Sequence, residues 1–279
     1  MRTTTLFVAV LCLCAAEAYG RTERAWNFDG DRREENVGTS VAIAPDVDGD
    51  GSPDVVTGAP YHGPQAVEDN KGKAFLLSGV DGTVLRVYSG EVVYDGFGFA
   101  VAGLSDVDGD GKGDVAVAAP YLDSTAGRVY VFSGGSGAPE TPLYAIEVAD
   151  RILDGRALSG GPDVDGDQVG DLLVASFSRV ALYSGVDGAF IREWSSEDGG
   201  ENFGASAAFT GQVSDGLGGK AQGVLIGAPD RERPPGAFTK GRGRVYVFSA
   251  ETGAQLRVLD GPDAGSSFGH AVANAGDMD

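Results

Sequence analysis

A phrase of nine residues that holds four aspartates occurs three times in this chain of 279 residues. It reads DVDGDGSPD at 46–54, DVDGDGKGD at 106–114 and DVDGDQVGD at 163–171. Copies spaced by about 60 residues indicate a repeated supersecondary unit, which constrains the fold more than any single motif does.

The residues around each phrase repeat as well. The first two units read VGTSVAIAPDVDGDGSPDVVTGAP and FGFAVAGLSDVDGDGKGDVAVAAP. A second shared phrase follows, as in KAFLLSGVDGTVLRV (73–87) and RVYVFSAETGAQLRVL (244–259). A fourth unit keeps FGASAAF and VLIGAP without the aspartates, and a fifth begins FGHAVANAGDMD at 268–279.

Each unit predicts four short strands. Apolar runs such as 115–118 and 129–132 are bounded by glycine-rich turns, and Asp-Gly at 81–82 and 187–188 is typical of a hairpin. Four strands at this period favour an all-β fold, a β-propeller of four-stranded antiparallel blades. About four and a half blades are present, so we expect an incomplete chain. A β-solenoid or a row of small sandwiches is the alternative.

The aspartate phrase has the composition of a cation site. Carboxylates at positions 1, 3, 5 and 9, without His or Cys, favour a hard cation, and calcium suits an irregular oxygen cage better than magnesium does. Position 7 varies, as expected where the main-chain carbonyl is the ligand. An EF-hand would need a Glu at position 12, where Thr57, Val117 and Val174 stand. The alternatives are solvated acidic turns, or calcium that only stiffens a hairpin.

The N-terminus indicates a secreted protein, and the charge restricts its partners. Residues 1–20 have the pattern of a signal peptide, and both cysteines, Cys12 and Cys14, lie within it. The net charge of −20 argues against nucleic acid and against anionic lipid as partners. No later stretch predicts a membrane span. A short segment, 21–35, precedes the repeats.

Together, Phe97-Gly98, the phrase at 106–114 and Ala118-Ala119-Pro120 resemble an FG-GAP repeat, the repeat of the integrin α-subunit N-terminal β-propeller. Gly58-Ala59-Pro60 and Gly227-Ala228-Pro229 match the GAP phrase outright. The resemblance covers about 36–279, in units of about 36–95, 96–154, 155–202, 203–266 and a partial 267–279. It implies an extracellular calcium-binding propeller, although the fourth unit keeps only Asp215 and predicts no such site.

The resemblance also implies the calcium ligands. Each loop would supply four side chains and the main-chain oxygen at position 7: Asp46, Asp48, Asp50, Ser52 and Asp54; Asp106, Asp108, Asp110, Lys112 and Asp114; Asp163, Asp165, Asp167, Val169 and Asp171.

Two classes of function follow. The first is an adhesion or recognition module that binds an extracellular protein or glycan; the second is an accessory propeller of a secreted hydrolase, such as a phospholipase D. His62 and His270 are the only imidazoles, and no catalytic motif accompanies them, so we expect no enzyme activity. Arg231, Arg233, Lys240, Arg242 and Arg244 form a basic loop that could contact an acidic partner. Tyr61 and Tyr121 either pack between blades or engage a partner.

Overall fold

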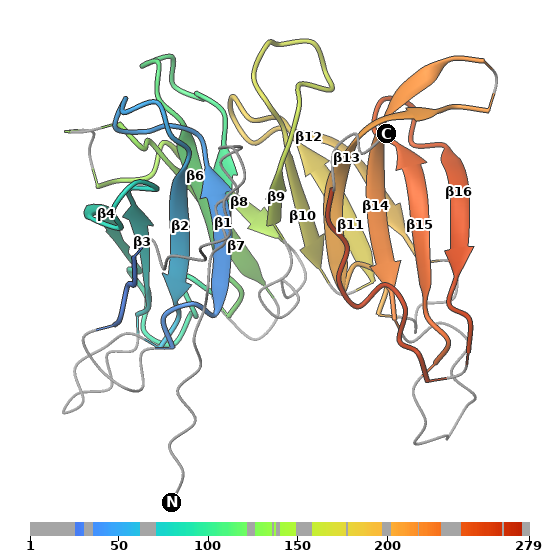
Figure 1. Cartoon of the computed structure of the whole chain (residues 1–279), viewed down its shortest axis with the longest axis horizontal. Helices are drawn as coiled ribbons and strands as arrows, with labels where there is room; N and C mark the ends of the chain where they lie inside the picture. Colours follow the sequence, from blue (N-terminus) through green and yellow to red (C-terminus); the bar gives the residue numbers. More distant parts are fainter. Residues whose placement is uncertain are drawn as a thin grey trace, which may run out of the picture.

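The computed structural model describes residues 26–30, 36–61, 71–121, 126–135, 137, 140–148, 158–176, 178–196, 202–216, 218–229, 241–263 and 265–274. These residues form four separate four-stranded sheets (Figure 1). Within each sheet, consecutive strands pair antiparallel, so every sheet is a simple meander. The predicted signal peptide lies outside the described residues.

Each sheet corresponds to one sequence unit. The first two blades contain β1 (Ser40–Ala44), β2 (Asp54–Ala59), β3 (Lys73–Leu77), β4 (Val84–Ser89), β5 (Ala100–Leu104), β6 (Asp114–Ala119), β7 (Gly127–Phe132) and β8 (Tyr144–Val148). The next two contain β9 (Leu158–Gly160), β10 (Leu172–Ser176), β11 (Arg179–Tyr183), β12 (Phe190–Ser195), β13 (Ser206–Ser214), β14 (Lys220–Ala228), β15 (Arg244–Ser249) and β16 (Gln255–Asp260).

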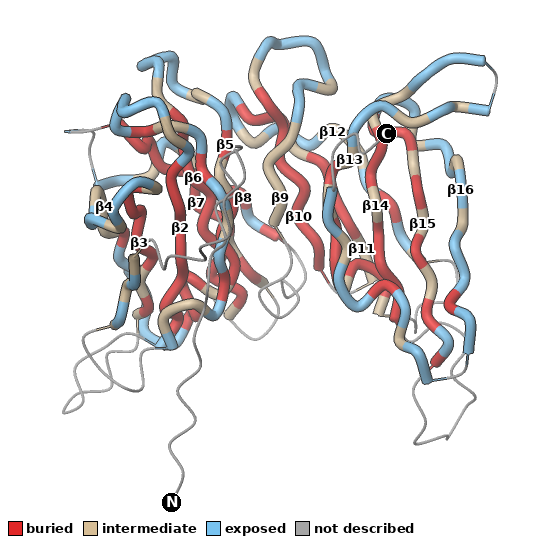
Figure 2. The backbone as a smooth tube through the Cα atoms, in the orientation of Figure 1, coloured by how far each residue is buried: buried red, intermediate tan, exposed pale blue. Residues whose placement is uncertain are grey.

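The burial pattern follows from stacking one sheet on the next. Strands β2, β6 and β10 are buried along their whole length, because both faces of their sheets are covered (Figure 2). The fourth strands β4, β12 and β16 have at most one buried residue each, and their other residues are partly or fully exposed. The first strands β1, β5, β9 and β13 contact one another in that order and border a central cavity of about 750 Å³. This is the predicted arrangement of β-propeller blades.

Successive blades meet where the Phe-Gly dipeptide of one unit lies on the Gly-Ala-Pro phrase of the unit before. A Cβ added to Gly58 would lie 1.8 Å from the carbonyl oxygen of Gly98, so no larger residue fits there. The Ser40 hydroxyl donates a hydrogen bond to the same oxygen, at 3.0 Å. Gly98 itself has φ of +91°, which favours glycine.

Replacing Gly58 with alanine should therefore weaken the contact between the first two blades. We expect Gly58→Ala to lower the free energy of unfolding by about 2 kcal/mol or more, because the backbone of the next blade must move away. Urea unfolding followed by circular dichroism measures this change. Gly211→Ala is the control, since a Cβ there meets no atom within 4 Å. Equal stability of the two variants would contradict the close contact.

A buried aspartate holds the segment that leads into the second blade. Asp95 is fully buried; its Oδ1 accepts a hydrogen bond from the Phe97 amide (2.9 Å), and its carbonyl accepts one from the Tyr121 amide (2.9 Å). Its Oδ2 is buried without a hydrogen-bond partner. Burial raises the pKa of Asp95 from 3.8 to about 6, opposed by the Phe97 and Val92 amides and by Arg128 and reinforced by Glu91.

This raised pKa predicts a pH dependence of stability. The folded chain binds the Asp95 proton more tightly than the unfolded chain does, so stability falls as pH rises from about 4 to 6, by up to about 1.4 kcal/mol per pH unit from this group. Asp95→Asn should remove this part of the slope. Urea unfolding in EDTA at pH 4.5, 5.5 and 6.5 measures it.

Asp187→Asn, at an exposed aspartate, should leave the slope as it is in the parent chain. A slope that Asp95→Asn leaves unchanged would show that Asp95 stays ionised in the fold.

Candidate metal centres

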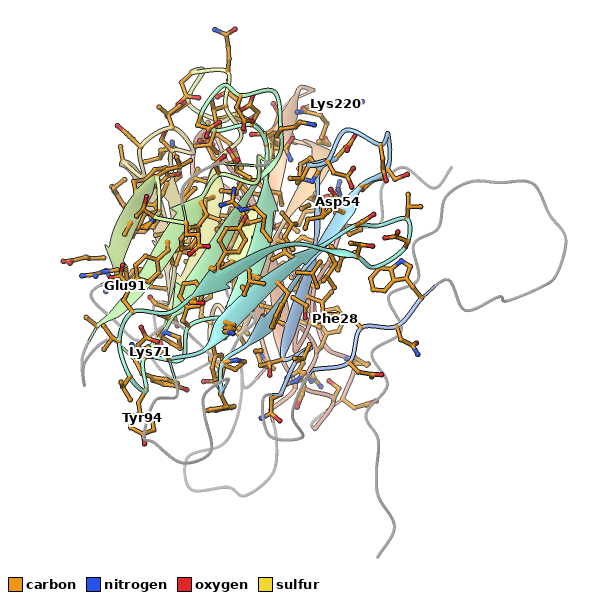
Figure 3. The ribbon with its side chains drawn as sticks, turned by 90° about the vertical axis from the view of Figure 1, so that its left-hand side faces the viewer. Phe28, Asp54, Lys71, Glu91, Tyr94 and Lys220 are labelled. Atoms are coloured by element: carbon orange, nitrogen blue, oxygen red, sulfur yellow. The ribbon has the colours of Figure 1, made fainter. Side chains whose placement is uncertain are left out.

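The three aspartate phrases lie in equivalent loops. Each joins the first strand of a blade to the second: β1 to β2, β5 to β6, and β9 to β10. The loops therefore connect two strands, whereas an EF-hand loop connects two helices. Asp54 and Lys220, at the same end of the first and fourth blades, lie far from Tyr94 and Lys71 at the opposite end (Figure 3).

The ninth residue of each phrase ties its loop to a neighbouring hairpin. Asp54 is fully buried and accepts hydrogen bonds from two amides, Val47 at 2.7 Å and Gly79 at 3.0 Å. Asp114 and Asp171 are also fully buried and repeat the arrangement. Asp114 accepts from the amides of Val107 (2.6 Å) and Gly134 (2.8 Å), and Asp171 from those of Val164 (2.8 Å) and Gly185 (3.2 Å).

The first residue of each phrase curls the loop around its own carboxylate. Asp46 accepts hydrogen bonds from the amides of Gly49 (2.7 Å) and Gly51 (2.9 Å). Both glycines have positive φ, 84° and 91°, which a Cβ would disfavour. In the third loop, Gln168 takes the place of the second glycine and still adopts φ of 75°.

The carboxylates converge, although not all four in any loop. One oxygen from each of three side chains lies within 4.8 Å of the others in three sets: Asp46, Asp48 and Asp50; Asp106, Asp108 and Asp114; Asp163, Asp165 and Asp167. Asp54, Asp110 and Asp171 are not in these sets. The amides of Ser52, Lys112 and Val169 donate to the carboxylate at position 5, each at 2.8 Å. The converging carboxylate groups offer only oxygen atoms as ligands, and such a set fits a hard cation.

The carboxylates at position 9 have raised pKa values, whereas those of Asp46 and Asp163, at position 1, have lowered pKa values. Burial, together with the neighbouring carboxylates of the same loop, raises the pKa of Asp114 and of Asp171 to about 6, although the two amides bonded to each carboxylate lower it. Burial also raises the pKa of Asp54. The amide of Gly51 leads the groups that lower the pKa of Asp46, and that of Gly166 leads for Asp163. A divalent cation would relieve the repulsion between these carboxylates.

The fourth blade has a different connection. Strands β13 and β14 are nine residues each and end in a hairpin where Asp215 accepts a hydrogen bond from the Gly219 amide at 2.8 Å. In the part of the chain that the structure describes, acidic groups close enough to share an ion occur only in the three phrases.

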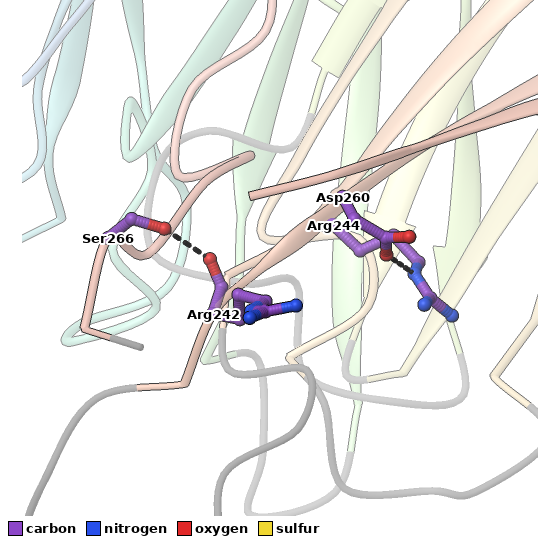
Figure 4. A network of polar contacts seen from close by, with 4 residues as sticks. All are labelled: Arg242, Arg244, Asp260 and Ser266. Atoms are coloured by element: carbon purple, nitrogen blue, oxygen red, sulfur yellow. Dashed lines mark hydrogen bonds and ion pairs between the residues drawn. The ribbon is translucent and has the colours of Figure 1, made fainter. Parts of the chain in front are cut away.

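The remaining candidates are dispersed. Tyr61 is 44% exposed, whereas Tyr121 packs edge-on against Phe99. Arg244 pairs with Asp260 at 2.5 Å, and the carbonyl of Arg242 accepts a hydrogen bond from Ser266 (Figure 4). His62, Arg231, Arg233 and Lys240 lie outside the described residues, so their predicted roles stay predictions.

Sequence reasoning missed the hydrogen bonds of two tryptophans, one to the next blade and one from the N-terminal segment to the first blade. The ring N–H of Trp194 donates to the carbonyl of Gly253 in the next blade, at 3.2 Å. That of Trp26, in the segment before the first strand, donates to the carbonyl of Gly79 at 3.1 Å. The repeat alignment could have revealed the role of Trp194, because Trp194 aligns with Tyr88. The Tyr88 hydroxyl likewise donates to a carbonyl of the next blade, that of Ser133, at 3.1 Å.

Comparison with known proteins agrees with the repeat analysis. The family model of the FG-GAP repeat matches residues 37–77 and 97–132. Integrin alpha-PS2 of Drosophila melanogaster is 37% identical over 177 residues, 57% of this chain and 12% of the relative. Human integrin alpha-IIb is 33% identical over 176 residues, which are 58% of this chain and 17% of the relative. Mouse integrin alpha-X is 30% identical over 181 residues, which are 59% of this chain and 15% of the relative. The chain thus spans a small part of the length of these relatives.

Solved structures are similar at low sequence identity. A protein of unknown function from Bacteroides caccae has a TM-score of 0.42 at 13% identity, covering 81% of this chain and 61% of its own. BBS1N, in complex with ARL6DN, has a TM-score of 0.49 at 12% identity, and the match covers 85% of this chain and 57% of BBS1N. The chain therefore carries FG-GAP repeats at 37–77 and 97–132, and its matched part is similar to integrin alpha subunits.

Proposed function

We propose that the chain is a secreted or cell-surface calcium-binding β-propeller that acts as an adhesion or recognition module, and not as an enzyme. The observation that carries this proposal is the recurrence of one oxygen-lined aspartate loop in three blades, of which the first two match the FG-GAP repeat. The similarity to integrin alpha subunits supports the recognition role. Within the described residues, no helix is long and apolar enough to cross a membrane.

Calcium would be held by the converging side chains, which are those at positions 1, 3 and 5 in the first and third loops and at positions 1, 3 and 9 in the second. The remaining carboxylate and the main-chain oxygen at position 7 would complete each shell. The ion supplies positive charge among like charges. Position 9 has a second task, because its carboxylate already joins two backbone amides of different segments. Calcium would therefore fix the loop to the hairpin that follows the third strand, and so stiffen the blade.

We place the partner at the end of the propeller opposite the aspartate loops. There, Val92, Val93 and Tyr94 are exposed consecutively, Tyr94 at 56%. Tyr94 also has φ of 64°, a conformation that costs free energy in a residue other than glycine and is common at binding sites. An extracellular protein or glycan is the class of partner that suits an exposed aromatic and aliphatic loop.

Calcium should stabilise the fold selectively. A cation that binds only the folded chain raises the melting temperature with its concentration. We expect residues 21–279 to melt at least about 5 °C higher in 2 mM calcium than in EDTA, with a smaller rise in magnesium. Differential scanning calorimetry measures both.

Two variants of the second loop distinguish residues that only bind the ion from a residue that also holds the fold together. Asp108→Ala with Asp110→Ala should reduce the calcium response while leaving the melt in EDTA nearly unchanged, because both side chains are exposed. Asp114→Ala should melt lower even in EDTA, since it leaves two backbone amides without their partner. A well-folded chain whose melt does not respond to calcium would refute calcium binding.

The recognition role predicts binding through the Val92–Tyr94 loop. The immobilised chain should bind at least one member of a panel of soluble matrix glycoproteins and sulfated glycans, measured by surface plasmon resonance. Val92→Ser with Tyr94→Ser should weaken that binding about tenfold or more. Val80→Ser, an exposed valine near the aspartate loops, is the matched control. Equal loss in both variants would exclude the Val92–Tyr94 loop as the contact.

A further inference from the structure

Consecutive aspartate loops touch each other through their eighth positions. Gly113, at position 8 of the second loop, lies against Pro45, which precedes the first loop: a Cβ on Gly113 would lie 2.7 Å from the Pro45 ring. Gly170, at position 8 of the third loop, donates its amide to the hydroxyl of Ser105, which precedes the second loop, at 2.9 Å. Position 7 of the second and third loops is therefore the chain neighbour of position 8, the residue that contacts the segment just before the preceding blade's loop.

At the first of these junctions, position 7 carries a charge. Lys112 belongs to the second loop, but its ammonium nitrogen would lie 2.8 Å from a Cβ on Gly49, in the middle of the first loop. Lys112 is only partly exposed, although its neighbours Asp110 and Gly111 are exposed. Its charge also acts on the first loop, where it contributes, after the amides of Gly51 and Gly49, to lowering the pKa of Asp46.

We propose that the ammonium of Lys112 is a built-in competitor of the divalent cation at the first aspartate loop, which makes that loop the weaker site. This inference rests on the proposed binding of calcium. The ammonium neutralises part of the negative charge that attracts calcium, and it must withdraw or tolerate repulsion when the ion enters. Its flexible four-carbon stem allows the withdrawal.

The third loop provides an internal comparison. Its position 7 is Val169, which offers no charge to the second loop. At both junctions position 8 contacts the residue that precedes the neighbouring loop, and position 7 differs, so the second loop lacks the competitor that the first has. The exchange of these two side chains should transfer the property from one loop to the other.

The test measures calcium affinity in full-length chains with one working loop, by equilibrium dialysis with radioactive calcium. Asp108→Asn, Asp110→Asn, Asp165→Asn and Asp167→Asn leave only the first loop. In that background, Lys112→Met should tighten calcium binding by about three- to tenfold, and Lys112→Arg should leave it within twofold. The gain should shrink when salt is raised from 0.05 M to 1 M, because exposed charges are screened.

The reciprocal variant tests the same idea in the second loop. Asp48→Asn, Asp50→Asn, Asp165→Asn and Asp167→Asn leave only the second loop, and Val169→Lys there should weaken calcium binding by a similar factor. No binding in the first background, with the chain folded by circular dichroism, would refute the proposed function at that loop. Binding that Lys112→Met does not change would overturn the competitor role alone. An equal gain in a chain with only the third loop working would also overturn it, since it would reflect net charge.

Discussion

The close approach of backbone to backbone between successive blades is the constraint on which this structure depends. The carbonyl of Gly98 lies on Gly58, and the carbonyl of Gly269 lies on Gly227 in the same way, with a Cβ on Gly227 only 1.9 Å from it. The hydroxyls of Ser40 and Ser206 donate to these two carbonyls. The Phe-Gly and Gly-Ala-Pro phrases are thus two halves of one contact between units, which explains physically why both recur.

The same contact orders the hydrophobic core. Phe97 and Phe203 are 1% and 2% exposed because each packs on aromatic residues of its own blade, Phe97 on Tyr130 and Phe203 on Tyr246. Phe268 is 38% exposed, although its parallel bridge to Gly243 matches the bridge of Phe97 to Gly72. The backbone contact therefore forms without the core that buries the ring, so the two contributions to the junction are separable.

Much of this could be predicted from sequence because it is local. The period, the Asp-Gly turns and the apolar runs predict four strands per unit, and Gly82 and Gly188 adopt the positive φ expected of them. The contacts between residues of different hairpins and blades could not be predicted from the sequence. The convergence of Asp106, Asp108 and Asp114, without Asp110, depends on how the loop closes on the next hairpin. The position of Lys112 beside Gly49 depends on the angle between two blades, which no spacing along the chain encodes.

The fourth blade shows what a blade needs when it lacks the aspartate phrase. Its first two strands extend past the point where the other blades turn, and they continue to pair through Gln212 with Gln222 and Ser214 with Lys220. Backbone hydrogen bonds of this ladder hold the connection that a carboxylate at position 9 holds elsewhere. A blade can therefore form without a cation, and the carboxylates at positions 1, 3 and 5 are not required by the sheet. Their recurrence in three of the four described blades, with oxygen atoms that converge on one point, is the reason we propose cation binding for them.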